Sequence, residues 1–250
     1  MDYNRPVILS IAVFDPSGGA GVLADVKTFE QHRCLGFAVV TALTVQTEDA
    51  FYKTVWQPLQ MVIDQCEPLF DYYKIDVVKI DIIENLDTLL NLVNWIKSKN
   101  SNIKIIWDTV LAASAGGSFI AYIDNDILTQ ILKRVYLITP NSIEVCLLTG
   151  HNDAKQSALT LAAQCSVYLK GGHSVEEKGV DFLYEGGKIA PYLPSEINLT
   201  KKHGSGCILS SAIAANLALG IHLEEACRLA KNYIEKVLKS NENLLAYHVQ

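Results

Sequence analysis

The residues best suited to chemistry lie in a Gly-rich turn, His203-Gly204-Ser205-Gly206-Cys207, which runs directly into an apolar helical pattern. The first turn of a helix leaves its backbone N–H groups unpaired and carries partial positive charge, so this turn can hold a phosphate. A helix N-terminus also lowers a thiol pKa from about 8.5 to about 3.5–7.5. The turn therefore predicts an anion site with Cys207 as a base, although a Gly-Ser-Gly sequence is also an ordinary helix start.

Several polar groups follow predicted strands. In parallel α/β sheets, ligands bind beyond the carboxyl ends of the strands, so these groups are expected to meet at one edge. Their common position is the main reason to expect a functional site there. The groups are Asp15–Gly21, Gln46, Asp108–Leu111, Thr139–Glu144 and Lys170–His173.

Asn141 and Glu144 are spaced to lie on one face of a helix. Mg²⁺ keeps several waters and takes few carboxylates, so Glu144 with Asn141 beside it would suit Mg²⁺ bound to ATP. The same spacing is that of a helix capping box, and both interpretations stay open. Lys170 is suited to nucleotide phosphates, and Asp108 either orients a magnesium-bound water or caps its loop.

The Gly-rich segment Asp15–Gly21 follows the first predicted strand. It is not a P-loop, because no Gly-Lys-Ser/Thr closes it, and its Gly spacing differs from the dinucleotide fingerprint. Asp25 on the following helix is either a partner of the helix dipole or a ligand for an amine or hydroxyl. Gln46 carries an amide that both donates and accepts, which suits the edge of a heterocycle.

Short β-branched runs alternate with helical patterns along residues 1–250. This alternation predicts a single α/β domain, with a mainly parallel sheet and helices on both faces. Gly186-Gly187 predicts a late hairpin that forms a small antiparallel edge. Strands are expected over 7–13, 37–45, 51–56, 76–80, 103–107, 135–139, 167–170, 180–185 and 188–192. Helices are expected over 21–33, 58–73, 86–99, 127–133, 142–149, 154–164, 206–219 and 223–238.

The composition is that of a globular protein. The 250 residues are 50% hydrophobic and 19% charged, with a net charge of −6. The scattered lysines and arginines give no nucleic-acid or membrane-surface footprint. No apolar run reaches the roughly 18 residues of a membrane span, and no secretory leader is expected. Six isolated cysteines favour a reducing, cytoplasmic environment.

In order and spacing, several segments resemble the ribokinase-like superfamily. Within it they are most similar to the hydroxymethylpyrimidine/phosphomethylpyrimidine kinases of thiamine biosynthesis. The similarity covers nearly the whole chain. The segments are Asp15–Gly21, Ala24–Thr28, Thr41–Gln46, Asp108–Val110, Leu137–Glu144, Lys170–His173 and His203–Ser211.

This resemblance implies a three-layer α/β/α sandwich that forms a homodimer. It implies transfer of the γ-phosphoryl of ATP, with Mg²⁺, onto a hydroxymethyl group, and in some members onto the resulting monophosphate. Cys207 would be the base, and the amides of Gly204, Ser205 and Gly206 would form the anion hole. Lys170 and Asn141 would contact ATP, and Glu144 and Asp108 would serve magnesium through water. The acceptor would be held by Gln46, Asp25, Val13, Thr44, Ile82 and Val110.

The chain departs from the family's pattern around the acceptor. Val13-Phe14 stands where the family has Gly-Ser/Thr, and Asp81-Ile82 stands where it has Gly-Met. Leu111, Lys201-Lys202 and Ile208 are further differences. Two alternatives therefore stay open beside the pyrimidine kinase. One is a pyridoxal/pyridoxine kinase of the same fold, and the other is a pyrimidine-binding regulator without turnover.

Overall fold

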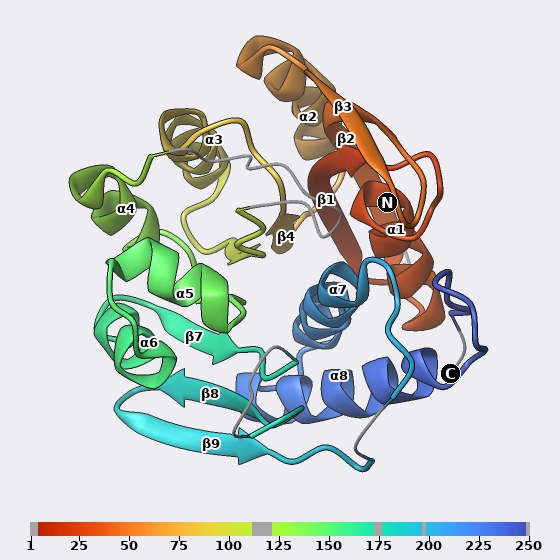
Figure 1. Cartoon of the computed structure of the whole chain (residues 1–250). Coiled ribbons are helices and arrows are strands. Elements are labelled where there is room, and N and C mark those ends of the chain that lie inside the picture. The colour runs from red at the N-terminus through yellow and green to blue at the C-terminus, as the bar shows by residue number, and fades with distance from the viewer. Residues whose placement is uncertain (1–4, 112–121, 173–176, 197–198, 249–250) are drawn as a thin grey trace.

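A nine-stranded sheet forms the middle of the molecule (Figure 1). The computed structural model describes residues 5–111, 122–172, 177–196 and 199–248. The strands lie in the order β3-β2-β1-β4-β5-β6-β7-β8-β9. Their bounds are β1 Val7–Phe14, β2 Leu35–Gln46, β3 Phe51–Trp56, β4 Val77–Ile80, β5 Lys104–Trp107, β6 Leu137–Ile138, β7 Ser166–Leu169, β8 Asp181–Glu185 and β9 Lys188–Tyr192.

Helices connect the strands and cover both faces of the sheet. No helix among the described residues is long and apolar enough to cross a bilayer. The helix bounds are α1 Gly21–Gln31, α2 Leu59–Tyr72, α3 Leu86–Lys99, α4 Asn125–Leu132, α5 Ser142–Thr149, α6 Ala154–Ala162, α7 Ser205–Ala218 and α8 Leu223–Leu238.

Each strand sends alternate side chains to opposite faces of the sheet. In β5, Ile105 and Trp107 pack in the core shared with α2 to α6, whereas Ile106 packs in the core shared with α1, α7 and α8. Neighbouring strands repeat this division, as Val78 and Val77 do in β4. Apolar residues on both faces require helices on both faces, and the predicted three-layer α/β/α sandwich is confirmed.

The sheet is parallel from β2 to β7 and antiparallel at both edges. The β8–β9 hairpin confirms the predicted antiparallel edge. The second edge, where β3 pairs with β2, was not predicted from the sequence. Residues 47–50 connect these strands, with the Thr47 N–H bonded to the Ala50 carbonyl at 2.8 Å. No glycine marks this turn, so the usual hairpin signal is missing.

Several predicted elements are longer than those observed. The strand expected over 135–139 is limited to Leu137–Ile138, and the helix expected over 154–164 ends at Ala162. Beyond the end of β6, the Thr139 N–H still donates to the Trp107 carbonyl at 3.1 Å, and the Thr139 hydroxyl donates to Asp108 Oδ1 at 2.9 Å. Side-chain hydrogen bonds are therefore added to the backbone bonds where the strand ends.

Candidate active site

The carboxyl ends of the parallel strands bring distant polar residues together. Asp15 follows β1, Asp81 follows β4, Asp108 follows β5 and Thr139 follows β6. Lys170 follows β7 and forms a parallel bridge with Asn141. These strands are parallel, so the residues lie together at the carboxyl end of the sheet, hereafter called the site edge.

The N-terminus of α7 is fixed at this edge by the Gly-rich loop after β1. Gly204 is the N-cap of α7 with φ of +70°, and an added Cβ would lie 2.0 Å from the Gly19 carbonyl oxygen. His203 Nε2 lies 2.9 Å from Asp15 Oδ2. Asp15 also accepts a bond from the Ala20 N–H, which closes the loop. The two Gly-rich segments therefore pack backbone to backbone, and no larger residue fits at Gly204.

Lys170 lies beside the first turn of α7. A Cβ added to Gly206 would be 3.3 Å from the Lys170 Nζ, and Lys170 is 2.8 Å from Asp108 Oδ1. Asp108 also accepts bonds from the Thr139 and Ser210 hydroxyls, both at 2.9 Å. Burial alone would raise the pKa of Asp108, but the nearby ammonium groups, led by Lys170, hold it below its usual value. An ammonium and the amides of a helix N-terminus therefore meet here, which suits an anion.

Asn141 and Glu144 form the capping box of α5. The Asn141 side chain accepts from the Glu144 N–H at 2.9 Å, and Glu144 accepts from the Asn141 N–H at 2.8 Å. Glu144 also accepts from the Thr109 hydroxyl at 3.3 Å and lies 3.9 Å from Lys170 Nζ. Burial raises the pKa of Glu144 to about 7. The capping box, one of the two interpretations of Asn141 and Glu144, is therefore present. The same arrangement places Glu144 beside Lys170.

Asp25 belongs to a buried ionic network that the sequence did not reveal. Lys79 in β4 is fully buried and lies 2.7 Å from Asp25 Oδ1 and 3.2 Å from Asp81 Oδ2. Asp25 also accepts from the Ser10 and Ser211 hydroxyls, at 2.6 and 2.7 Å. Asp25 is itself fully buried, so its predicted contact with a substrate stays a prediction. The sequence feature that could have indicated a buried ion pair is the single lysine, Lys79, within an otherwise apolar strand.

The helix N-terminus favours the thiolate of Cys207, but the surroundings of the thiol act in the opposite direction. The thiol is buried and donates a hydrogen bond to Asp81 Oδ2 at 3.2 Å. Burial, followed by the negative charge of Asp81, raises the pKa of Cys207 well above its usual value. The helix dipole is correctly placed, but these two effects outweigh it. In the resting protein, the side chain of Cys207 is therefore a protonated thiol.

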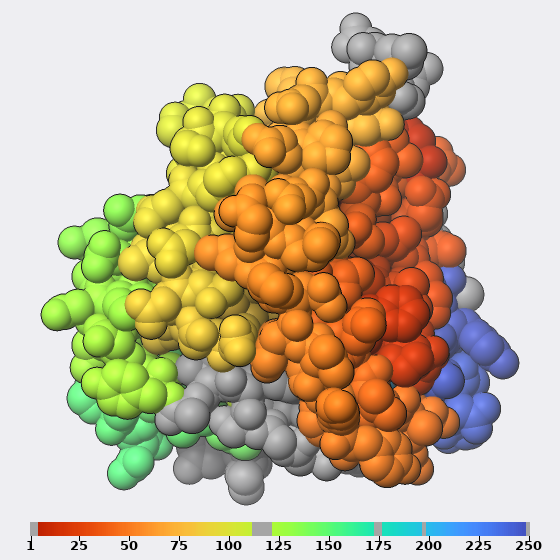
Figure 2. All heavy atoms as spheres, turned by 90° about the horizontal axis from the view of Figure 1, so that it is seen from above, coloured from red at the N-terminus to blue at the C-terminus, as the bar shows by residue number. Residues whose placement is uncertain are grey.

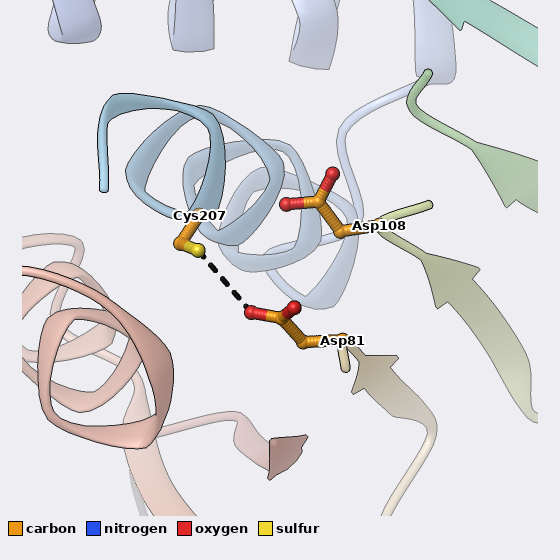
Figure 3. A group of neighbouring side chains, drawn as sticks. All are labelled: Asp81, Asp108 and Cys207. Atoms are coloured by element: carbon orange, nitrogen blue, oxygen red, sulfur yellow. Dashed lines mark hydrogen bonds between the residues drawn. The ribbon is translucent and has the colours of Figure 1, made fainter. Parts of the chain in front are cut away.

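Asp81, Asp108 and Cys207 point toward one another from the ends of β4 and β5 and from α7 (Figure 3). One donor atom from each lies within 4.8 Å of the other two. This spacing could hold a metal ion, but Lys79 already contacts Asp81 and Lys170 already contacts Asp108. Each carboxylate of the cluster is therefore already paired with an ammonium group, which makes direct metal binding by the three side chains unfavourable.

The expected acceptor residues lie beside this cluster. Val13, Ile82 and half-buried Val110 pack in one small apolar cluster with Ala42 and Trp56. They come from the ends of β1, β4 and β5, which explains how residues distant in sequence meet.

The two polar acceptor residues lie on β2. The hydroxyl of Thr44 donates to the Phe14 carbonyl at 3.0 Å, so it holds β2 against β1. Gln46 is the half-buried last residue of β2. The roles of these residues toward an acceptor stay predictions.

Comparison with known proteins gives a consistent match. Residues 15–250 match the family model for phosphomethylpyrimidine kinase. The hydroxymethylpyrimidine/phosphomethylpyrimidine kinase of Aquifex aeolicus is 34% identical over 247 residues, which cover 95% of this chain and 96% of that protein. Among solved structures, the phosphomethylpyrimidine kinase of Clostridium difficile has a TM-score of 0.76 at 29% identity and covers 93% of this chain and 99% of its own. The ADP complex of Bacillus subtilis pyridoxal kinase has a TM-score of 0.84 at 25% identity and covers 98% of both chains.

Proposed function

The chain belongs to the phosphomethylpyrimidine kinase family, and we propose that it transfers the γ-phosphoryl of ATP to 4-amino-5-hydroxymethyl-2-methylpyrimidine. The acceptor group is the hydroxymethyl, and the monophosphate formed is a second candidate acceptor. The observation that carries the proposal is the meeting of Lys170, Cys207 and the first turn of α7 at one sheet edge. This arrangement offers an anion site and a proton-handling group side by side.

The chemistry requires positioning and charge neutralisation more than covalent catalysis. The amides at Gly204 to Cys207 would bind the oxygens that gain charge as the phosphoryl group transfers. Lys170 would add a positive charge beside them, and its bond to Asp108 keeps the ammonium aimed at this turn. Asn141 forms a β-bridge with Lys170, which joins the end of β7 to the start of α5. Asn141 would therefore contact the nucleotide phosphates beside Lys170.

Glu144 and Asp108 are the carboxylates that would serve Mg²⁺. Asp108 already accepts bonds from Thr139, Lys170 and Ser210, so it would act through water. Glu144 is one carboxylate beside a phosphate site, which fits an ion that takes few protein ligands and keeps its waters. When bound, the ion would neutralise the charge of the ATP phosphates.

The acceptor ring would lie against the apolar cluster of Val13, Ile82 and Val110. Gln46 and Thr44 on β2 would supply polar contacts to the ring edge. Asp25 would act indirectly, through its ion pair with Lys79. Ile82 directly follows Asp81, which contacts the thiol of Cys207. The hydroxymethyl group would therefore face the thiol while the ring stays in the apolar part.

Pyridoxal is the second candidate acceptor. It is favoured by the higher TM-score of the Bacillus subtilis pyridoxal kinase and by the presence of Asp81 beside the acceptor cluster. Pyridoxal also presents a hydroxymethyl group on a heteroaromatic ring, so the same machinery would serve. The family match and the identity to the Aquifex aeolicus kinase favour the pyrimidine.

The test is ADP release from ATP and Mg²⁺ with hydroxymethylpyrimidine, its monophosphate or pyridoxal as acceptor. Turnover on the pyrimidines, reduced by about 10²–10⁴ in Cys207→Ala, is the expected result. Turnover on pyridoxal alone would show that pyridoxal is the acceptor, and the proposed mechanism would still hold. Tight pyrimidine binding without turnover on any acceptor would instead support a regulator.

We further propose a homodimer built on the β2–β3 edge. Leu43, Val45 and Val55 are large apolar side chains that are 47%, 53% and 43% exposed. Leu43 and Val55 are paired across the two strands, so these side chains lie together. Figure 2 shows the orange residues of β3 and α2 on the outer surface of the molecule.

A cytoplasmic location is also a proposal. All six cysteines are free, and Cys34, Cys66 and Cys227 are buried thiols. Free thiols are typical of proteins kept in a reducing compartment.

A further inference from the structure

Asp81 is a buried carboxylate where the family's pattern has glycine. It follows β4 directly, is 1% exposed, and contacts the thiol of Cys207 and the ammonium of Lys79 through the same oxygen, Oδ2. Its other oxygen, Oδ1, is buried and has no hydrogen-bond partner among the described residues. A buried carboxylate with a free oxygen costs stability, so a residue of this kind beside a reactive thiol calls for a functional explanation.

The charges around Asp81 leave its own charge partly uncompensated. Lys79 faces it from β4, Asp25 from α1, Asp108 from the end of β5 and Cys207 from α7. Lys79 is shared, and it lies closer to Asp25, at 2.7 Å, than to Asp81, at 3.2 Å. Burial and the neighbouring carboxylates outweigh Lys79 and raise the pKa of Asp81. Asp81 is thus a better proton acceptor than an exposed aspartate.

The thiol of Cys207 cannot act alone as a base. It holds its proton in the resting state, because burial and Asp81 oppose the thiolate. A thiol that receives a proton from a hydroxyl group must release its own proton at the same time. The hydrogen bond from Sγ to Asp81 Oδ2 provides the path for that release.

We propose that Asp81 is a positioning residue that orients the Cys207 thiol and takes its proton as the thiol takes the proton of the acceptor hydroxyl. This inference rests on the proposed kinase function. The acceptor O–H bond breaks and its proton goes to Sγ, while the Sγ–H proton goes to Asp81 Oδ2. The acceptor oxygen forms a bond to the γ-phosphorus of ATP, and the bond from that phosphorus to the bridging oxygen breaks, with its electron pair leaving on ADP. Sulfur begins and ends as a thiol, and Asp81 later returns its proton to solvent.

The first test follows the S–H infrared band of Cys207, identified by its loss in Cys207→Ser. In the wild type the band should persist to higher pH than in Asp81→Asn, because the variant removes the negative charge that opposes the thiolate. A fall in the thiol pKa by roughly one unit or more is expected. Asp71→Asn on the exposed face of α2 is the matched control and should leave the band unchanged. An unchanged band in Asp81→Asn would overturn the proposal, whether or not the chain turns over any acceptor.

The second test is kinetic. Asp81→Asn and Asp81→Gly should both lower kcat by about 10²-fold or more, with the KM of both substrates within about threefold of the wild type. Activity in Asp81→Asn should recover as pH rises into the range where its thiol ionises, a recovery that a merely structural defect would not give. Equal or faster turnover in Asp81→Gly would show that the thiol works alone and would overturn the proposal. Absence of turnover in the wild type would refute the kinase function instead, and the infrared result would still decide the link between Asp81 and Cys207.

Discussion

Lys79 is the residue on which the stability of the site depends most directly. It is fully buried and compensates two buried carboxylates, Asp25 and Asp81. Replacing one partner of a buried ionic network leaves uncompensated charge, so Lys79→Met should lower the free energy of unfolding by about 3–5 kcal/mol. Urea denaturation measures this loss.

The matched control is Lys74→Met, which removes an exposed ion pair. Lys74 and Asp76 lie 3.1 Å apart, with side chains 85% and 56% exposed. Exposed pairs contribute less than about 1 kcal/mol. Similar small losses in both variants would contradict the stabilising role of Lys79.

At the residue scale, the sequence indicated where the site residues lie better than it indicated their ionisation states. Cys207, Asp108, Lys170 and Glu144 were each expected at strand or helix ends, and they lie there together. The ionisation of Cys207 could not be predicted from the sequence, because it depends on burial and on Asp81, which lies 126 residues away in the chain. Lys79 was missed because its partners come from other elements, and no local pattern identifies them.

At the scale of elements, the start of α7 depends on a close contact with the loop after β1. Gly204→Ala would place a Cβ 2.0 Å from the Gly19 carbonyl oxygen, in addition to the cost of a left-handed φ. Gly220, just beyond the other end of α7, also has a left-handed φ, +82°, but an added Cβ there meets nothing within 4 Å.

Gly220→Ala should therefore cost only about 1–2 kcal/mol, the usual cost of this backbone conformation. Gly204→Ala should cost more than this and should also reduce turnover, because it moves the amides of the anion site. Thermal unfolding and the kinase assay measure the two effects. Equal destabilisation by both variants would show that the contact with Gly19 is unimportant.

The cap of α5 should make stability depend on pH. The pKa of Glu144 is raised from 4.5 to about 7 in the folded protein, so the folded state holds the proton more tightly than the unfolded state. The resulting stability is fully present below about pH 4.5 and is lost as pH rises through 7.

Glu144→Gln stays neutral and keeps the capping geometry, since glutamine serves the same capping position. Relative to the wild type, its free energy of unfolding should increase by up to about 3 kcal/mol between pH 4.5 and 8. Denaturation of the metal-free proteins at several pH values tests this. A constant difference between the two proteins would contradict the raised pKa.

Most elements were predictable because their patterns are strong. The alternation of strands and helices implies parallel pairing, and Gly186-Gly187 marks the β8–β9 hairpin. The β2–β3 pair was not predictable in this way, because its turn lacks glycine and its strands carry exposed apolar residues. Pairing partners at this edge depend on tertiary contacts that a local pattern does not contain.

At the scale of the whole molecule, the β2–β3 edge offers a surface for self-association. If it forms the proposed dimer interface, Leu43→Asp together with Val45→Asp would bury charge at the contact and should shift the protein from dimer to monomer. Light scattering coupled to size exclusion measures the mass. The exposed Ile143→Asp and Leu147→Asp substitutions on α5 are the control and should leave the mass unchanged. A wild-type monomer would contradict the proposed dimer.

The central claim is direct phosphoryl transfer from ATP to a hydroxymethylpyrimidine at the N-terminus of α7. The most direct measurement supplies ATP with a radiolabelled γ-phosphate and follows the label into the pyrimidine product. Labelled hydroxymethylpyrimidine phosphate, formed by the wild type and reduced by about 10²–10⁴ in Cys207→Ala, is the predicted result. Label released only as inorganic phosphate, or label transfer undiminished in Cys207→Ala, would contradict the account.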